Sequence, residues 1–77
     1  MEPKERVLKD ISMFYESLDL ISKANLDKGM KDVVEMSKLY ASDAKSYLDK
    51  GDVLTAFSCI SYAHGLMDSI LSLVDLK

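Results

Sequence analysis

The sequence contains one histidine, His64, and an aspartate four residues after it, Asp68. Side chains four residues apart are neighbours on one face of a helix, so this pair could share a proton or a ligand. A tight chain reversal at Gly51 would bring Tyr40 level with His64 and place Asp43 one helical turn away. We therefore predict a polar cluster of Tyr40, Asp43, His64 and Asp68 between the second and third of the helices inferred below.

Three kinds of chemistry fit this predicted cluster. In the first, the imidazole is partly buried and its polar atoms are satisfied by Asp68 or Tyr40, which fixes the register between helices. In the second, His64, Asp68 and Asp43 bind a metal ion and leave coordination positions open. In the third, His64 acts as a general acid or base and Asp68 orients it.

The structural interpretation is favoured over the other two. A single histidine is a weak metal pattern, because metal sites in helical bundles usually repeat a Glu-x-x-His element on facing helices. No nucleophile is clearly directed at His64. We therefore predict no catalytic residue, no resident metal and no cofactor, and we keep a metal-binding, small-molecule-binding or enzymatic cluster as the alternative.

The composition predicts one small globular domain over residues 1–77. Hydrophobic residues make up 48% of the chain and charged residues 30%, which is too apolar for disorder. The net charge is −3, only one arginine is present, and lysines alternate with acidic residues, so no nucleic-acid partner is expected. The single cysteine, Cys59, cannot form an intrachain disulfide, which favours a reducing compartment and a cytoplasmic location.

No membrane association is expected from the sequence. The charged N-terminus lacks an apolar run of the kind that a signal peptide or anchor needs. The segment from residue 53 to residue 74 has one charge, Asp68, and is long enough to cross a bilayer. Its serines, His64 and Asp68 are nevertheless too many polar groups to place in lipid.

Apolar residues recur at alternating spacings of three and four along most of the chain, as in amphipathic helices. We predict three helices over about residues 3–24, 28–50 and 53–75, joined by short links. Short links between helices of this length imply antiparallel neighbours, so the expected fold class is an all-α, up-down-up three-helix bundle. The predicted core positions of the second helix are Met30, Val33, Tyr40, Ala44 and Tyr47, with Ser37 as a polar interruption.

Local signals support the helix ends. Pro3 suits a first helical turn, and Glu2 before it is a weak cap. Asn25 is expected to end the first helix and Asp27 to cap the second. Gly51 and Asp52 form the strongest boundary, because glycine accepts a left-handed turn and aspartate caps the helix that follows.

The third helix has more apolar surface than one seam requires. Beside its main seam lies a second apolar set, made of Cys59, Tyr62, Leu66 and Leu73. A helix with two apolar faces must be covered on more than one side, so we predict that this set forms an interaction surface. The partner is another protein or a second copy of the chain, and both alternatives stay open. Gly65, on a neighbouring line of small residues, is expected where another backbone comes close.

Three short motifs resemble one known family. They are Y-x-x-D-A at Tyr40–Ala44, G-D-x-x-x-A-F at Gly51–Phe57 and Y-A-H-G-x-x-D at Tyr62–Asp68. Together they resemble domain of unknown function family 357, a group of short archaeal proteins. The resemblance implies a small archaeal cytosolic helical bundle and no assigned activity. It draws attention to the matching polar and glycine positions, which are Tyr40, Asp43, Asp52, His64, Gly65 and Asp68.

These observations together predict a non-catalytic helical module. We expect it to bind a protein partner, itself or another chain, through the third helix.

Overall fold

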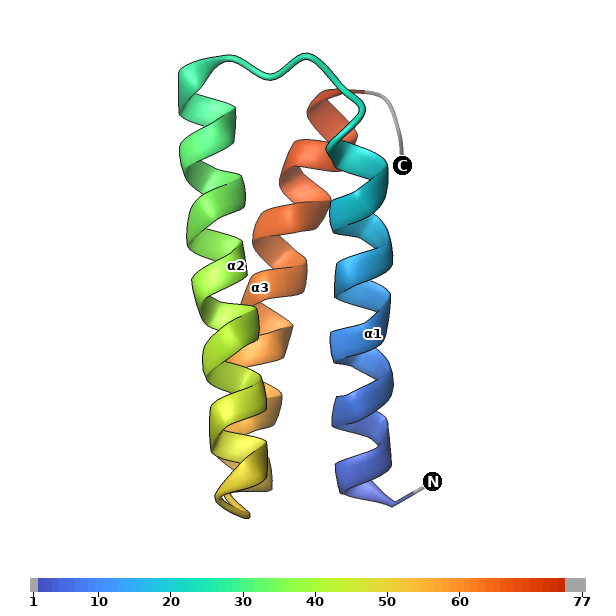
Figure 1. Ribbon diagram of the computed structural model, residues 1–77, viewed down its shortest axis with the longest axis vertical. Coiled ribbons are helices and arrows are strands. Elements are labelled where there is room, and N and C mark those ends of the chain that lie inside the picture. The colour runs from blue at the N-terminus through green and yellow to red at the C-terminus, as the bar shows by residue number, and fades with distance from the viewer. Residues whose placement is uncertain (1, 75–77) are drawn as a thin grey trace.

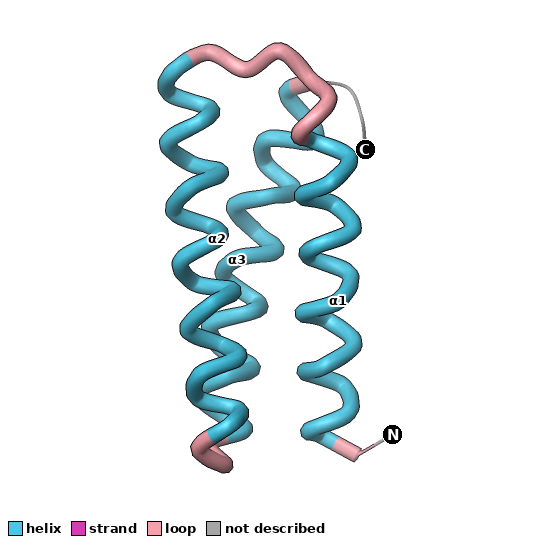
Figure 2. Tube along the Cα trace, in the orientation of Figure 1, coloured by secondary structure: helices cyan, strands magenta, loops and turns pink. Residues whose placement is uncertain are grey.

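The computed structural model describes residues 2–74, which form three helices (Figure 1, Figure 2). The helices are α1 (Pro3–Ile21), α2 (Lys28–Asp49) and α3 (Val53–Leu73). They run up, down and up, and each one packs against the other two. The predicted all-α three-helix bundle is therefore confirmed, and no strand is present within the described part of the chain.

Helix α1 begins where Pro3 predicted, and its buried residues are Val7, Ile11, Phe14 and Ile21. Glu2 occupies the cap position, but its side chain makes no capping hydrogen bond. The predicted end at Ala24 is wrong, because α1 ends at Ile21. The Ser22 hydroxyl donates to the Asp19 carbonyl at 2.6 Å, and the next amides bond three residues back, so the chain tightens and leaves the helix early.

Helix α2 starts at the predicted residue because Asp27 caps it, accepting a hydrogen bond from the Met30 amide at 2.8 Å. Its buried face differs from the prediction. The fully buried positions are Val34, Ser37, Ala41, Ala44 and Leu48. The predicted polar interruption, Ser37, is thus inside the core, where its hydroxyl donates to the Val34 carbonyl at 2.6 Å. The small side chains of this face let α3 approach closely.

The link between α2 and α3 is a helix-ending turn built on Gly51. Gly51 has a φ of 86°, its amide donates to the Leu48 carbonyl, and the Asp52 amide donates to the Tyr47 carbonyl at 2.9 Å. This paired arrangement satisfies carbonyls that the end of α2 leaves without helical partners. Asp52 then caps α3 by accepting from the Thr55 amide at 3.1 Å. Both predicted turn residues are confirmed in these roles.

The Asp52 carboxyl group has a pKa below its usual value. Hydrogen bonds from the Thr55 side chain and backbone lower the pKa of Asp52, because they stabilise the charged form. The cap therefore stays ionised at neutral pH.

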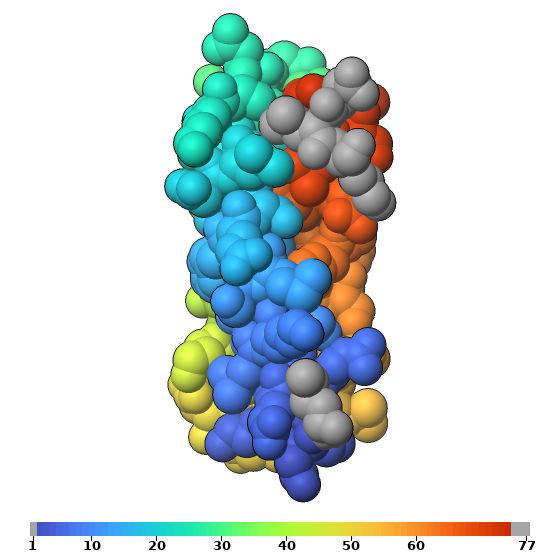
Figure 3. All heavy atoms as spheres, turned by 90° about the vertical axis from the view of Figure 1, so that its right-hand side faces the viewer, coloured from blue at the N-terminus to red at the C-terminus, as the bar shows by residue number. Residues whose placement is uncertain are grey.

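Helix α3 is the central element of the core. Its buried residues contact both other helices, and α2 and α3 pack on each other more extensively than α1 packs on either. Figure 3 shows α1, in blue and cyan, lying along α3, in orange. Within the described residues α3 ends at Leu73, and the predicted last helical residue, 75, lies outside them. No helix in residues 2–74 is both long and apolar enough to span a bilayer.

Candidate functional site

His64 contacts α1 and joins two distant parts of the chain. Its Nε2 lies 2.7 Å from the backbone oxygen of Asp10. Because a carbonyl oxygen can only accept, Nε2 carries the hydrogen and donates it. The imidazole also meets the ring of Phe14 edge-on, with the ring centres 6.1 Å apart. The half-buried imidazole thus fixes the register between α3 and α1.

His64 and Asp68 line the same shallow, open depression between α1 and α3. Arg6 and Asp10 of α1 line it too, although sequence reasoning connected neither residue with the histidine. Arg6 and Asp10 lie more than fifty positions before His64 in the sequence, so only the register of α1 against α3 could place them beside it. The two carboxylates beside the single guanidinium make the depression unsuitable as an anion site.

Tyr40 lies on a different side of α3. Its ring meets that of Tyr62 at a centre-to-centre distance of 4.5 Å and an interplanar angle of 61°. Tyr62 and His64 are two residues apart, so their side chains leave the helix in nearly opposite directions. The arrangement expected from the sequence, with Tyr40 facing His64, is therefore not the one that the structure adopts.

The predicted four-residue cluster is accordingly divided into two pairs. His64 and Asp68 face α1, whereas Tyr40 and Asp43 belong to the side of α2 that meets Tyr62 and Cys59. The three residues considered as metal ligands, His64, Asp68 and Asp43, do not come together. Among the described residues, no group of three or more His, Cys, Asp or Glu side chains is arranged to hold a metal ion.

Cys59 is half-buried and packs against the hydrophobic core. Burial raises the pKa of the Cys59 thiol, and the negative charges of Asp43 and Asp52 raise it further. The thiol is therefore mostly protonated at neutral pH and is a poor nucleophile, as expected for a small core hydrophobe.

Many apolar side chains lie on the side of α2 and α3 that faces away from α1. We call this side the distal face, and its residues are Val33, Met36, Tyr40, Tyr47, Cys59, Tyr62, Leu66 and Leu73. On α2 these residues lie opposite the ones that face α1, and on α3 they lie opposite His64. All four residues predicted for an interaction surface belong to the distal face.

Several distal side chains are well exposed. The exposed fraction is 46% for Met36, 49% for Tyr62 and 66% for Leu73. The α3 half of the face has no charged residue. On the α2 half, Asp43 lies between Tyr40 and Tyr47 on the same side of the helix and acts on the Cys59 thiol, and the Lys50 ammonium sits 5.5 Å from the centre of the Tyr47 ring. The distal face is therefore uncharged along α3 and carries Asp43 and Lys50 along α2.

Other exposed apolar residues are placed differently. On α1, Met13, Tyr15 and Leu20 alternate with charged residues along the helix. Leu54 of α3 is 78% exposed, but it borders a depression that Arg6 also lines. Scattered apolar residues of this kind are normal on protein surfaces, whereas a continuous uncharged patch marks an interaction site.

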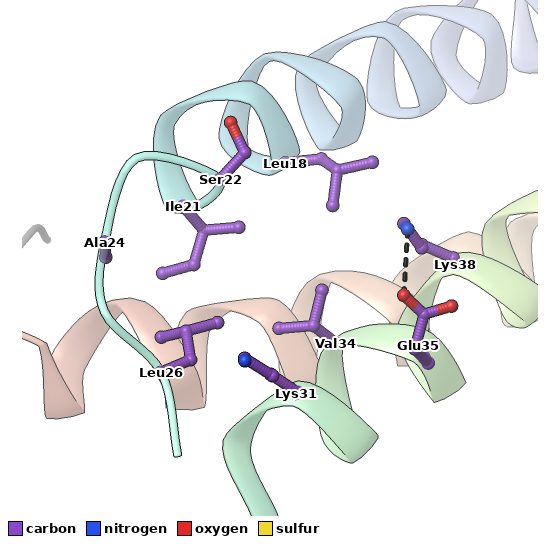
Figure 4. Close-up of a pocket in the computed structure, with 9 residues that line it drawn as sticks. All are labelled: Leu18, Ile21, Ser22, Ala24, Leu26, Lys31, Val34, Glu35 and Lys38. Atoms are coloured by element: carbon purple, nitrogen blue, oxygen red, sulfur yellow. Dashed lines mark hydrogen bonds and ion pairs between the residues drawn. The ribbon is translucent and has the colours of Figure 1, made fainter. Parts of the chain in front are cut away.

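A small hollow also lies where α1 ends and α2 begins (Figure 4). Leu18 and Ile21 of α1 and Leu26 of the connecting loop point toward Val34 of α2. Charged side chains form part of its rim, including Lys38, which is paired with Glu35 at 2.9 Å. The hollow is open to solvent. Leu26 packs against the core beside it, so the hollow marks the place where the connecting loop closes the end of the bundle.

Gly65 is not a point of close backbone approach in the described chain. A Cβ atom built at Gly65 would have no heavy atom from other parts of the structure within 4 Å. The expectation that another backbone comes close is therefore not met within the single chain.

Comparison with known proteins places the chain in a family. No curated protein matches it. The family described as "Protein of unknown function (DUF357)" matches residues 9–74, which include most of α1 and all of α2 and α3. This match contains the three motifs on which the resemblance depended and extends well beyond them. The chain belongs to the DUF357 family.

Proposed function

We propose that this protein is a non-catalytic association module, located in the cytoplasm, that binds a protein partner through the distal face. The observation that carries the proposal is the exposure of Met36, Tyr62 and Leu73 on one side of the molecule, whose α3 half has no charge. Exposing so much apolar area to water is unfavourable, and a partner that covers it removes this cost. Aromatic residues and methionine are also the types enriched at protein interfaces.

The position of His64 supports a non-catalytic role. The Nε2–H group is engaged with the Asp10 carbonyl. The polar residues first considered for chemistry are divided between two sides of α3, so among residues 2–74 these four side chains do not converge on one point. The distal face is thus a better candidate for the functional surface than the polar depression that contains His64.

Site-specific photocrosslinking in cells of the source organism tests this proposal. A photoreactive amino acid at position 62 should give a covalent adduct of defined mass with one protein partner, because Tyr62 lies near the centre of the distal face. The matched control is the same amino acid at position 54, which is more exposed on the same helix but lies off the face. Equal adducts at both positions, or none at position 62, would contradict the proposal.

A second variant separates the two interpretations of the polar residues. His64→Gln should leave the adduct at position 62 intact, since His64 points toward α1 and away from the distal face. If His64→Gln abolishes the adduct while the protein remains folded, the functional surface includes the histidine and the proposal is wrong.

A further inference from the structure

We infer that the partner of the distal face is a second copy of this chain, so that two protomers associate face to face about a twofold axis. This inference rests on the proposed function, because it names the occupant of the same surface.

The charge pattern permits the distal face to meet itself. In a twofold dimer the same patch lies on both sides of the interface, so a central charge would oppose an equal charge. The α3 half of the distal face contains none, because α3 has only Asp68 as a charged residue between residues 53 and 74 and Asp68 faces the α1 side. On the α2 half, Asp43 and Lys50 have opposite signs. A second copy can therefore set Asp43 of one protomer near Lys50 of its partner.

The area available on two distal faces reaches the lower limit for a dimer. The exposed parts of the eight distal side chains amount to on the order of 500 Å², given that a large apolar side chain presents roughly 150–250 Å². Two such faces bury on the order of 1,000 Å² in total, which is the lower limit for a specific interface. A second copy also supplies an equal set of apolar side chains, which lose their contact with water in the same step.

The arrangement of the helices also supports a second copy as the partner. Helices α2 and α3 form the best-packed pair, and α1 covers one side of that pair. The opposite side, which carries the distal face, has no other helix of residues 2–74 against it. If two protomers join at their distal faces, the α2–α3 pairs of the two protomers pack on each other. Each pair is then covered on one side by its own α1 and on the other side by the pair of the second protomer.

Sedimentation equilibrium and native mass spectrometry on the purified full chain, over a wide range of concentration, test the inference. The wild-type protein should reach twice the chain mass of 8.6 kDa as its concentration rises. Tyr62→Lys and Leu73→Lys should each weaken the dimer by roughly a hundredfold or more, because each places an ammonium group among apolar side chains of the interface. Leu54→Lys, the matched control on α3, should dimerise like the wild type.

The outcomes separate this inference from the proposed function. Loss of the dimer in both distal variants, with circular dichroism unchanged from wild type, supports the inference. Leu73 is 66% exposed, so Leu73→Lys keeps the test valid even if loss of the Tyr40–Tyr62 contact unfolds Tyr62→Lys. A wild type that stays monomeric at all concentrations overturns the second-copy inference, while an adduct of position 62 with a different protein would still support the proposed function. A dimer that persists in both variants shows an interface elsewhere and also overturns the inference.

Discussion

At the scale of single residues, His64 connects two helices through one hydrogen bond. Its Nε2–H group bonds to a carbonyl 54 residues away, and its ring meets Phe14. Removing the imidazole in His64→Ala should lower the free energy of unfolding by about 1–2 kcal/mol, the sum of a lost hydrogen bond and lost ring packing. His64→Gln should cost less, because the glutamine amide can donate from nearly the same position.

Urea denaturation of both variants measures these changes. Equal losses for alanine and glutamine would show that the hydrogen bond contributes little and that packing against Phe14 explains the effect. The sequence predicted that His64 is a structural residue within an apolar surface, but it could not supply the partner. The partner is a backbone carbonyl of α1, which no side-chain motif marks, and its register is set by packing along the whole helix pair.

At the scale of the elements, Gly51 and Gly65 have different backbone conformations, so replacing each with alanine should have opposite effects on stability. Gly51 has a positive φ that lets the chain turn from α2 to α3, whereas Gly65 lies in the middle of α3 with open space around its Cα. Gly51→Ala should destabilise the protein by about 1–2 kcal/mol, because an alanine in the left-handed region is strained. Gly65→Ala should stabilise it by about 0.5–1 kcal/mol through the higher helix propensity of alanine.

Thermal unfolding of the two variants, followed by circular dichroism, checks both signs. The pair is well matched because neither Cβ meets a neighbouring atom within the chain, so the backbone conformation alone distinguishes them. Destabilisation by Gly65→Ala would contradict this account and would indicate that another backbone comes close to Gly65 in solution.

Helix ends and helix faces differed in how well the sequence predicted them. Caps that depend on one residue type, Asp27, Gly51 and Asp52, were predicted correctly because each acts locally. The buried face of α2 was predicted only in part. Ala44 and Ser37, both on the predicted seam, are buried, and Ala41 joins them because small residues allow α2 and α3 to approach. Tyr40 and Tyr47 instead lie at the margin, with Tyr47 37% exposed, because size alone does not place a side chain in the core.

At the scale of the whole molecule, the three helices contribute unequally to one fold. Helices α2 and α3 form the best-packed pair and are joined by a capped, tight turn, whereas α1 packs less extensively and is joined by a longer loop. A small domain of this size has little stability to spare, so uneven packing should produce uneven local stability. The same inequality leaves one side of the α2–α3 pair uncovered, which is the side used in the proposed association.

Native-state hydrogen exchange should therefore show that α1 opens before the rest of the bundle. Amides in the middle of α1 should exchange at least roughly tenfold faster than those in the middle of α2 and α3, because separating α1 breaks fewer contacts than global unfolding does. The measurement is best made on Leu73→Lys, in which a dimer would not add protection to α2 and α3. Val7→Ala, which removes buried contacts of α1, should accelerate exchange in α1 alone if α1 opens as a unit. One common free energy of exchange for all three helices would show that the bundle opens only as a whole, and α1 would then be as firmly held as the pair it covers.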